Sequence, residues 1–209
     1  MHEIEEHPDS VLETVSHPRT GLQVPKRPRM KHGAFQIYTG EGKGKSTASL
    51  GLMLRALGAG LRVYYLRMLK PRWKTGELKL CGQPGFHPNL TFRNVPHYWA
   101  LCVSKHVPQD IEAMRAEMVP EMESLHQEVS SGRHDVVIVD EINYCLHRGL
   151  ITLEQVLQVV DGRPPLVELV FTGRHAPPEL LERADVVTEM KKVKHHFEQG
   201  IRARVGIEF

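Results

Sequence analysis

A glycine-rich segment in the first quarter of the chain constrains the fold more than any other feature of the sequence. It reads Thr-Gly-Glu-Gly-Lys-Gly-Lys-Ser-Thr over residues 39–47, after a short apolar run and before a helical pattern. In that context the glycines let backbone N–H groups converge on anionic oxygens at the start of a helix, whose dipole adds positive charge. The segment therefore predicts a phosphate-binding loop between a β-strand and an α-helix.

The charged and hydroxyl residues of this segment predict a triphosphate ligand with Mg²⁺, in preference to a glycine-rich turn without a ligand. Lys45 supplies a full positive charge, and the Ser46 hydroxyl is a suitable Mg²⁺ ligand. The G-x-x-x-x-G-K-[ST] pattern is not met literally, because its first glycine falls on Thr39 and Gly40 comes one residue late. The shift disfavours an ordinary ATPase or GTPase, and Lys43 becomes a second cation in the loop. The predicted nucleotide-binding residues are Gly40, Glu41, Gly42, Lys43, Gly44, Lys45, Ser46 and Thr47.

The remainder of the chain predicts an α/β fold with a three-layer arrangement. From Ala34 onward, short apolar runs alternate with helical patterns, as in βαβ units with a parallel sheet between helices. The expected strands are 34–38, 62–67, 90–95, 135–139, 166–171 and 186–189. Several of these runs are apolar on consecutive residues, which is typical of central strands that are buried on both faces.

Helical periodicity accompanies these strands. Leu50, Met53, Leu54 and Leu57 fall at i, i+3, i+4 and i+7, which predicts one buried stripe on a helix that Gly58 ends. The other expected helices are 110–128, which Pro120 interrupts, 152–160 and 178–184.

The first 31 residues differ from the rest in composition. They contain four prolines and few large apolar side chains, so residues 1–31 are predicted to be a flexible tail and residues 32–209 a single domain. The tail ends in a basic run, Lys26, Arg27, Arg29 and Lys31. A solvated linker is the favoured interpretation of this run, while a nucleic-acid patch and a lid over an anionic ligand are the alternatives.

Composition excludes several classes of partner and location. Lys and Arg number 27 against 25 Asp and Glu, so no overall field favours nucleic acid or a membrane surface. The three cysteines, Cys81, Cys102 and Cys145, form no C-x-x-C pair, which predicts free thiols without structural zinc. Without a long apolar run or a basic leader, the chain is expected to be cytoplasmic.

Polar residues at the ends of three further strands add candidate ligands. The apolar run 135–139 ends in Asp140 and Glu141, which resembles a Walker B element that holds Mg²⁺. The alternative is that one of these carboxylates only caps a helix near Asn143. Arg174 and His195 follow later strands, and the planar guanidinium of arginine suits phosphate recognition.

Together these motifs resemble the ATP:cob(I)alamin (corrinoid) adenosyltransferases of the P-loop type, over most of the chain. The similarity includes the shifted first glycine of the loop, and Pro71 replaces a glycine of that family's K-G-x-W-x-x-G-E segment. The other matching stretches are 54–58, the set Lys70, Trp73, Gly76 and Glu77, and then 139–144, 171–174, 184–190, 193–195 and 206–209.

The resemblance implies a RecA-like parallel sheet, usually in a homodimer, that transfers the adenosyl group of ATP to Co(I) of a reduced corrinoid such as cobalamin. Triphosphate is the leaving group, and a reductase partner supplies Co(I). The catalytic residues implied are Lys45, Glu141 and Arg174, and the metal ligands are Ser46, Asp140 and Glu141. Further cofactor-binding residues implied are Arg55, Trp73, His97, Trp99, Arg174 and His195.

One segment departs from the family pattern. Where the family has G-x-G-F-T-W, residues 94–99 read Asn-Val-Pro-His-Tyr-Trp, so His97 stands in place of a phenylalanine and Trp99 keeps one aromatic ring. An imidazole at that position is able to ligate cobalt; a packed loop without a ligand is the alternative. The competing functions are a P-loop hydrolase or kinase and a non-catalytic corrinoid- or nucleotide-binding relative.

Overall fold

A computed structural model describes residues 13–28, 30–69, 75–95 and 111–208. Its centre is a six-stranded sheet in the order β5-β4-β6-β7-β3-β8, in which every neighbouring pair is parallel. The strands are β3 (Phe35–Thr39), β4 (Val63–Arg67), β5 (Leu90–Asn94), β6 (Val136–Asp140), β7 (Glu168–Thr172) and β8 (Val186–Glu189). The predicted α/β class with a parallel sheet is confirmed, and all six expected strands are present within two residues of their predicted bounds.

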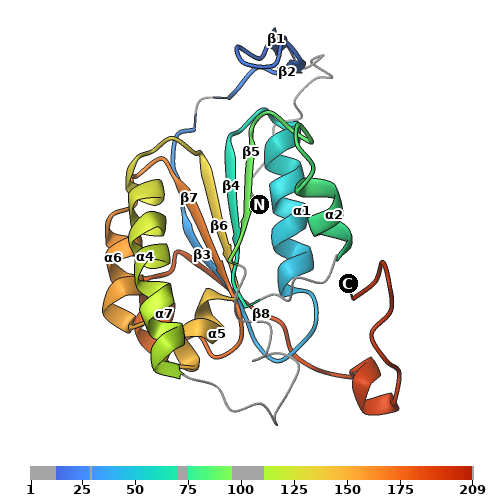
Figure 1. The fold of residues 1–209 in the computed structure, drawn as a ribbon, viewed down its shortest axis with the longest axis vertical. Helices are drawn as coiled ribbons and strands as arrows, with labels where there is room; N and C mark the ends of the chain where they lie inside the picture. Colours follow the sequence, from blue (N-terminus) through green and yellow to red (C-terminus); the bar gives the residue numbers. More distant parts are fainter. Residues whose placement is uncertain (1–12, 29, 70–74, 96–110, 209) are drawn as a thin grey trace, which may run out of the picture.

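Helices cover both faces of this sheet (Figure 1). On one side lie α1 (Lys45–Gly58) and α2 (Gly76–Cys81), and on the other lie α4 (Ile111–Ser130), α5 (Ile142–His147), α6 (Leu153–Asp161) and α7 (Pro178–Arg183). Successive residues of β4 show how the layers form: Val63 and Tyr65 pack in the core beneath α1 and α2, while Tyr64 and Leu66 pack beneath α4 and α6.

The buried stripe of α1 differs from the prediction. Met53 and Leu57 are buried, but Leu54 is 56% exposed and Leu50 is only partly buried. Ser49 and Ala56 fill the buried face instead. Small side chains occupy these positions because α1 crosses close over β6, a packing that hydrophobic periodicity does not reveal.

Two short helices, α2 and α5, were not predicted from the sequence. The helices α2 and α5 have six residues each, too few to show a periodic pattern. In contrast, α4 continues through Pro120 to Ser130. None of the helices among the described residues is long and apolar enough to cross a membrane.

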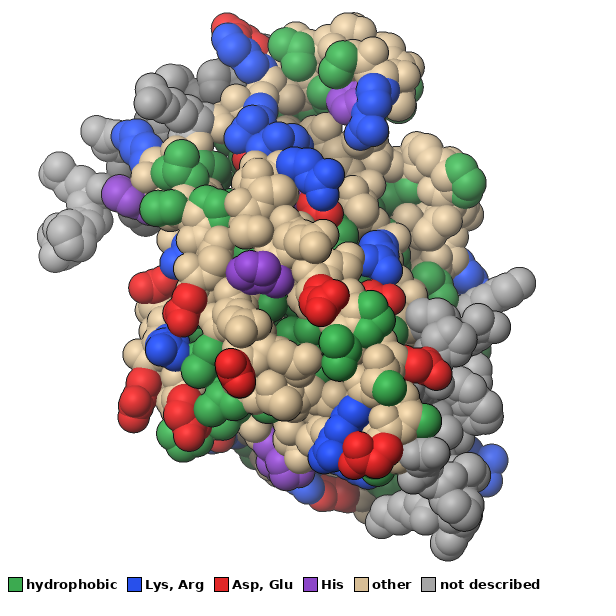
Figure 2. Space-filling view, turned by 60° about the vertical axis from the view of Figure 1, so that its left-hand side comes forward, with side chains coloured by type: hydrophobic (Ala, Val, Ile, Leu, Met, Phe, Trp, Pro, Cys, Tyr) green, Lys and Arg blue, Asp and Glu red, His purple; other side chains and the backbone are tan. Residues whose placement is uncertain are grey.

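The tail region contains a small antiparallel hairpin of β1 (Thr14–Ser16) and β2 (Gln23–Pro25), with Val24 buried. The hairpin lies beyond the amino-terminal ends of the sheet strands, and Figure 2 shows several Lys and Arg side chains gathered around it. Lys26 there pairs with Glu13, and Arg27 Nη2 lies 2.5 Å from Asp135 Oδ1, just before β6. Lys26 and Arg27 lie at the edge opposite the glycine-rich loop, so their placement does not favour a lid over that loop.

Candidate nucleotide-binding site

The glycine-rich loop connects the carboxyl end of β3 to the start of α1, as predicted. Gly40 and Gly44 adopt φ values of 94° and 120°, a region that disfavours residues with a Cβ atom. The N–H of Gly42 donates to the carbonyl of Met190 at 2.6 Å, so the segment after β8 braces the loop. A Cβ atom on Gly40 or Gly42 would lie 2.6 Å from that carbonyl oxygen, so both glycines are required by close backbone approach.

Lys45 opens α1 and turns back into the loop. Its ammonium donates to the carbonyls of Gly40 at 2.6 Å and Gly42 at 2.7 Å, and the residue is only 8% exposed. The ammonium therefore lies inside the curve of the loop, at the positive end of the helix dipole. A buried cation at this place favours a polyanionic ligand over a neutral one.

A polar cluster joins this helix start to the ends of β6 and β7. The carboxylate oxygen Oδ1 of Asp140 accepts hydrogen bonds from Ser46 Oγ at 2.8 Å and from Thr172 Oγ1 at 2.5 Å. The Thr172 hydroxyl also accepts from the backbone N–H of Glu141 at 3.0 Å. Asp140 and Thr172 are at most 1% exposed, so the cluster fixes the carboxylate beside the phosphate loop.

This cluster fits a magnesium ion, because Mg²⁺ in nucleotide sites binds one or two protein oxygen ligands together with phosphate oxygens and water. Ser46 and Asp140 supply such oxygens within hydrogen-bond distance of each other. Within the described ranges no group of three or more His, Cys, Asp and Glu side chains is arranged for a metal, so a site made only of such side chains is not found there.

Glu141 stands at the N-cap position of α5, but its side chain makes no capping hydrogen bond. Its φ of 71° is unusual for a residue with a Cβ atom. Because the Asp140 carboxylate is engaged with Ser46 and Thr172, neither acid acts as the side-chain cap that the sequence left open.

A second group of charged and aromatic side chains borders the loop. Glu41 lies 3.3 Å from Arg174 Nη1 and 3.6 Å from His175 Nε2. The ring of His175 stacks on that of His147 with centroids 4.0 Å apart. Partial burial lowers the pKa of His147, and the charges of His175 and Arg148 lower it further. The predicted Arg174 thus reaches the loop, although here its partner is Glu41.

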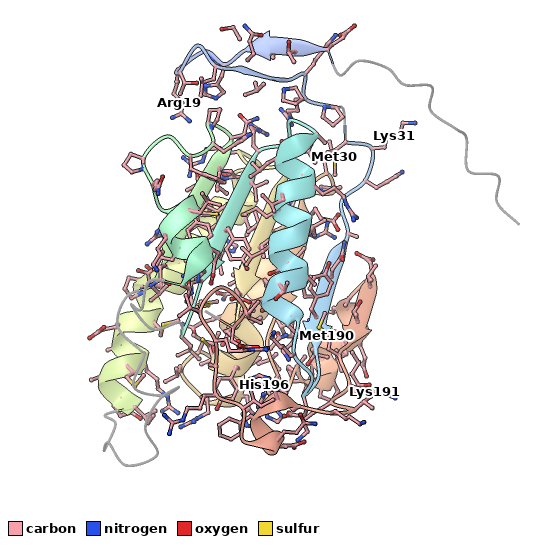
Figure 3. The ribbon with its side chains drawn as sticks, turned by 90° about the vertical axis from the view of Figure 1, so that its right-hand side faces the viewer. Arg19, Met30, Lys31, Met190, Lys191 and His196 are labelled. Carbon is pink, nitrogen blue, oxygen red and sulfur yellow. The ribbon has the colours of Figure 1, made fainter. Side chains whose placement is uncertain are left out.

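The carboxyl-terminal segment also meets the loop. Figure 3 shows Met190, Lys191 and His196 at the end of α1 where the loop lies, while Arg19, Met30 and Lys31 lie at the other end. Lys43 Nζ donates to Glu208 Oε1 at 3.1 Å. Hydrogen bonds from Arg204 hold the pKa of Glu208 well below its usual range. The short 3₁₀ helix η1 (His196–Gln199) begins after His195, whose Nδ1 accepts from Phe197 N at 3.2 Å.

One described residue of the prediction, Arg55, stands apart from this cluster. Arg55 is exposed, about 15 Å along α1 from Lys45 at the usual rise of a helix. Trp73, His97 and Trp99 lie outside the described residues, as does Lys70. Within the described chain, the loop lies together with Asp140, Glu141 and Arg174 at the carboxyl ends of the strands, which we call the nucleotide edge as the candidate site.

Three further residues at this edge were not predicted from the sequence to belong to the site. Thr172 holds both acids of the β6 end, Met190 braces the loop through its backbone, and Glu208 pairs with Lys43. Thr172 had a detectable signal, because it is a hydroxyl residue that ends an apolar strand. Met190 and Glu208 lie in the stretches 184–190 and 206–209 that resemble the family, but a backbone contact and a distant ion pair leave no local pattern that assigns either residue to the loop.

A cavity of about 630 Å³ lies at the opposite edge of the sheet. Its lining includes Arg27, Met30, Asp135, Pro164 and Leu166. It contains none of the phosphate-loop residues, so its position does not match that of the nucleotide edge.

The sequence of the chain is similar to that of known corrinoid adenosyltransferases. Residues 31–209 match the family described as ATP:corrinoid adenosyltransferase BtuR/CobO/CobP. The corrinoid adenosyltransferase of Pseudomonas aeruginosa is 34% identical over 189 residues, which cover 87% of this chain and 86% of that protein. The corrinoid adenosyltransferase of Escherichia coli K12 is 30% identical, and corrinoid adenosyltransferase CobA of Salmonella typhimurium is 29% identical; each alignment covers 86% of this chain and 87% of the relative.

Proposed function

The chain belongs to the ATP:corrinoid adenosyltransferase family, and we propose that it transfers the 5′-deoxyadenosyl group of ATP to the Co(I) centre of a reduced corrinoid. The observation that carries the proposal is the buried Lys45 ammonium inside a phosphate loop whose first helical hydroxyl, Ser46, is bonded to Asp140. That arrangement suits a triphosphate, and the family assigns the transfer.

The reaction is a nucleophilic substitution at the ribose 5′ carbon, in which one bond forms and one bond breaks. An electron pair of Co(I) forms the cobalt–carbon bond, and the carbon–oxygen bond breaks with its electrons passing to triphosphate. No water has to be activated, so Glu141 is better suited to holding a metal than to acting as a general base. We assign to Lys45 and Arg174 the stabilisation of the negative charge that grows on the leaving triphosphate, because both side chains contact the phosphate loop.

Magnesium is part of the same proposal. Ser46 and Asp140 would hold the ion, with Glu141 at the same strand end, and it would neutralise phosphate charge. Thr172 keeps the Asp140 carboxylate oriented toward Ser46 by donating to it. The ion pair with Glu41 holds the Arg174 guanidinium near the loop. This pair has to open before Arg174 can contact a phosphate.

A homodimer, a reductase that supplies Co(I), and a cytoplasmic location complete the proposal. The homodimer rests on the family resemblance, because single exposed apolar side chains such as Leu54 and Phe197 are also ordinary on the surface of a monomer. The reductase follows from electron balance, because cobalt in higher oxidation states cannot supply the attacking pair. Light scattering of the purified chain measures the dimer directly.

The decisive experiment mixes the protein with ATP, Mg²⁺ and chemically reduced cobalamin under anaerobic conditions and follows the corrinoid spectrum. We expect alkylcobalt product with stoichiometric triphosphate, and a loss of product in Lys45→Met of about a hundredfold or more. Release of ADP or orthophosphate without alkylcobalt product would instead identify a P-loop hydrolase or kinase. Ligand binding without any turnover would identify a non-catalytic relative.

A further inference from the structure

Arg67, the last residue of β4, is a buried cation that the proposed mechanism does not use. Its side chain is 1% exposed, and its Nη2 atom lies 3.2 Å from Glu77 Oε1 on α2. The Glu77 contact is an ion pair without hydrogen-bond geometry, and among the described residues neither Nη1 nor Nη2 donates a hydrogen bond. A guanidinium carries five N–H donors, and leaving several of them buried and unsatisfied is costly. Arg67 therefore keeps buried N–H donors that are available to a further acceptor.

The position of Arg67 in the sheet places it beside the nucleotide edge. Arg67 is the register partner of Asp140 on the adjacent parallel strand. Paired residues of parallel strands share a face and lie about 5 Å apart. Both therefore lie on the α1 side of the sheet, where Asp140 accepts from Ser46 at the start of that helix.

Tyr65, two residues before Arg67 on β4, lies on the same face of the sheet. Its hydroxyl lies 2.7 Å from Ser49 Oγ of α1. Burial raises the pKa of this hydroxyl well above its usual value, and the charge of Asp140 raises it further, while the charge of Arg67 lowers it. Arg67 and Asp140 thus lie within electrostatic reach of one hydroxyl beneath the first turns of α1.

We propose that Arg67 is a further anion-binding residue of this edge, whose guanidinium donates to the triphosphate that the phosphate loop holds. The inference rests on the proposed function, because it assigns a ligand to a residue at the same site. Before the nucleotide binds, the Glu77 carboxylate holds the guanidinium in place and offsets part of its charge. The triphosphate oxygens then accept hydrogen bonds from the N–H groups that lack a partner.

The test measures the dissociation constant of inorganic tripolyphosphate with Mg²⁺ by calorimetry on the full chain. Arg67→Gln is expected to weaken binding about tenfold, and Arg67→Lys to recover part of the loss because it keeps the charge. Glu77→Gln removes the competing anion, so its affinity is expected to equal or exceed that of the unaltered chain.

Arg93→Gln is the matched control. Arg93 lies one strand away on β5, faces α4, and pairs with Glu121 and Tyr64 rather than with the nucleotide edge. Its substitution is expected to leave tripolyphosphate affinity within about twofold, as for a site with no shared partners.

Two results would overturn the inference. One is an Arg67→Gln variant that binds tripolyphosphate within about threefold of the unaltered chain. The other is an equal loss in Arg67→Gln and Glu77→Gln, which would assign the pair a purely structural role; Arg67→Lys and Glu77→Gln decide the question if Arg67→Gln does not fold. Failure of the proposed function would appear instead in the unaltered chain, as absent alkylcobalt product or binding that Lys45→Met leaves unchanged.

Discussion

Replacing Thr172 with valine tests whether the hydroxyl at the end of β7 organises the acidic strand end. Valine has nearly the same shape, so the change removes two hydrogen bonds without leaving a cavity: the 2.5 Å bond to Asp140 and the 3.0 Å bond from the Glu141 N–H. Thr172 is 0% exposed, so water cannot replace either bond.

The magnitude follows from the two bonds. A hydrogen bond to a charged group contributes about 1.5–3 kcal/mol and a neutral one about 0.5–1.5 kcal/mol, so Thr172→Val is expected to lower the free energy of unfolding by about 2–4 kcal/mol. Guanidinium denaturation followed by circular dichroism measures this value, provided that the slope of the transition is unchanged. Thr172→Ser keeps the hydroxyl and is expected to recover most of the loss.

Thr188→Val on the exposed strand β8 is the matched control, with an expected change within about 0.5 kcal/mol. The reasoning is refuted if Thr172→Val is no less stable than this control. A second measurement tests function: loss of the Thr172 bond should also weaken Mg²⁺-dependent ATP binding, because the Asp140 carboxylate then loses one of the hydrogen bonds that orient it beside Ser46.

Two further predictions concern the opposite ends of the sheet. Burial alone would raise the pKa of Asp135, but hydrogen bonds and charge from Arg62 outweigh it and lower the pKa below 3.8. Asp135→Asn should therefore cost about 2 kcal/mol of stability at neutral pH, and the difference should vanish as the pH falls below 3.8 and through the folded-state pKa, in denaturation curves across pH; a constant difference would contradict it. Gly40→Ala places a methyl group 2.6 Å from the Met190 carbonyl at a φ of 94° and should weaken ATP binding about tenfold or more by calorimetry. Gly51→Ala, in open space on α1, is its control and should leave the affinity unchanged.

Local sequence patterns predicted some residues of the candidate site but not the residues that contact them. The loop at 39–47 and the acids at the end of β6 were identified because strand-to-helix turns and strand ends have characteristic compositions. The hydrogen-bond and ion-pair partners of these residues were not identified from the sequence. Asp140 meets Ser46 across 94 positions of sequence, and Lys43 meets Glu208 across 165. No local pattern encodes such distances.

The sequence by itself determined the α/β class, the six strands and the place of the phosphate loop, because apolar runs and glycine spacing are set by backbone geometry and burial. The tertiary structure decided which strands are neighbours. The order β4-β6-β7-β3 sets Arg67 beside Asp140 and Thr172 beside both acids of the β6 end, while Arg27 of the tail pairs with Asp135 at the other edge. Strand order is a property of global packing, so the charges that surround the loop became visible only in the folded chain.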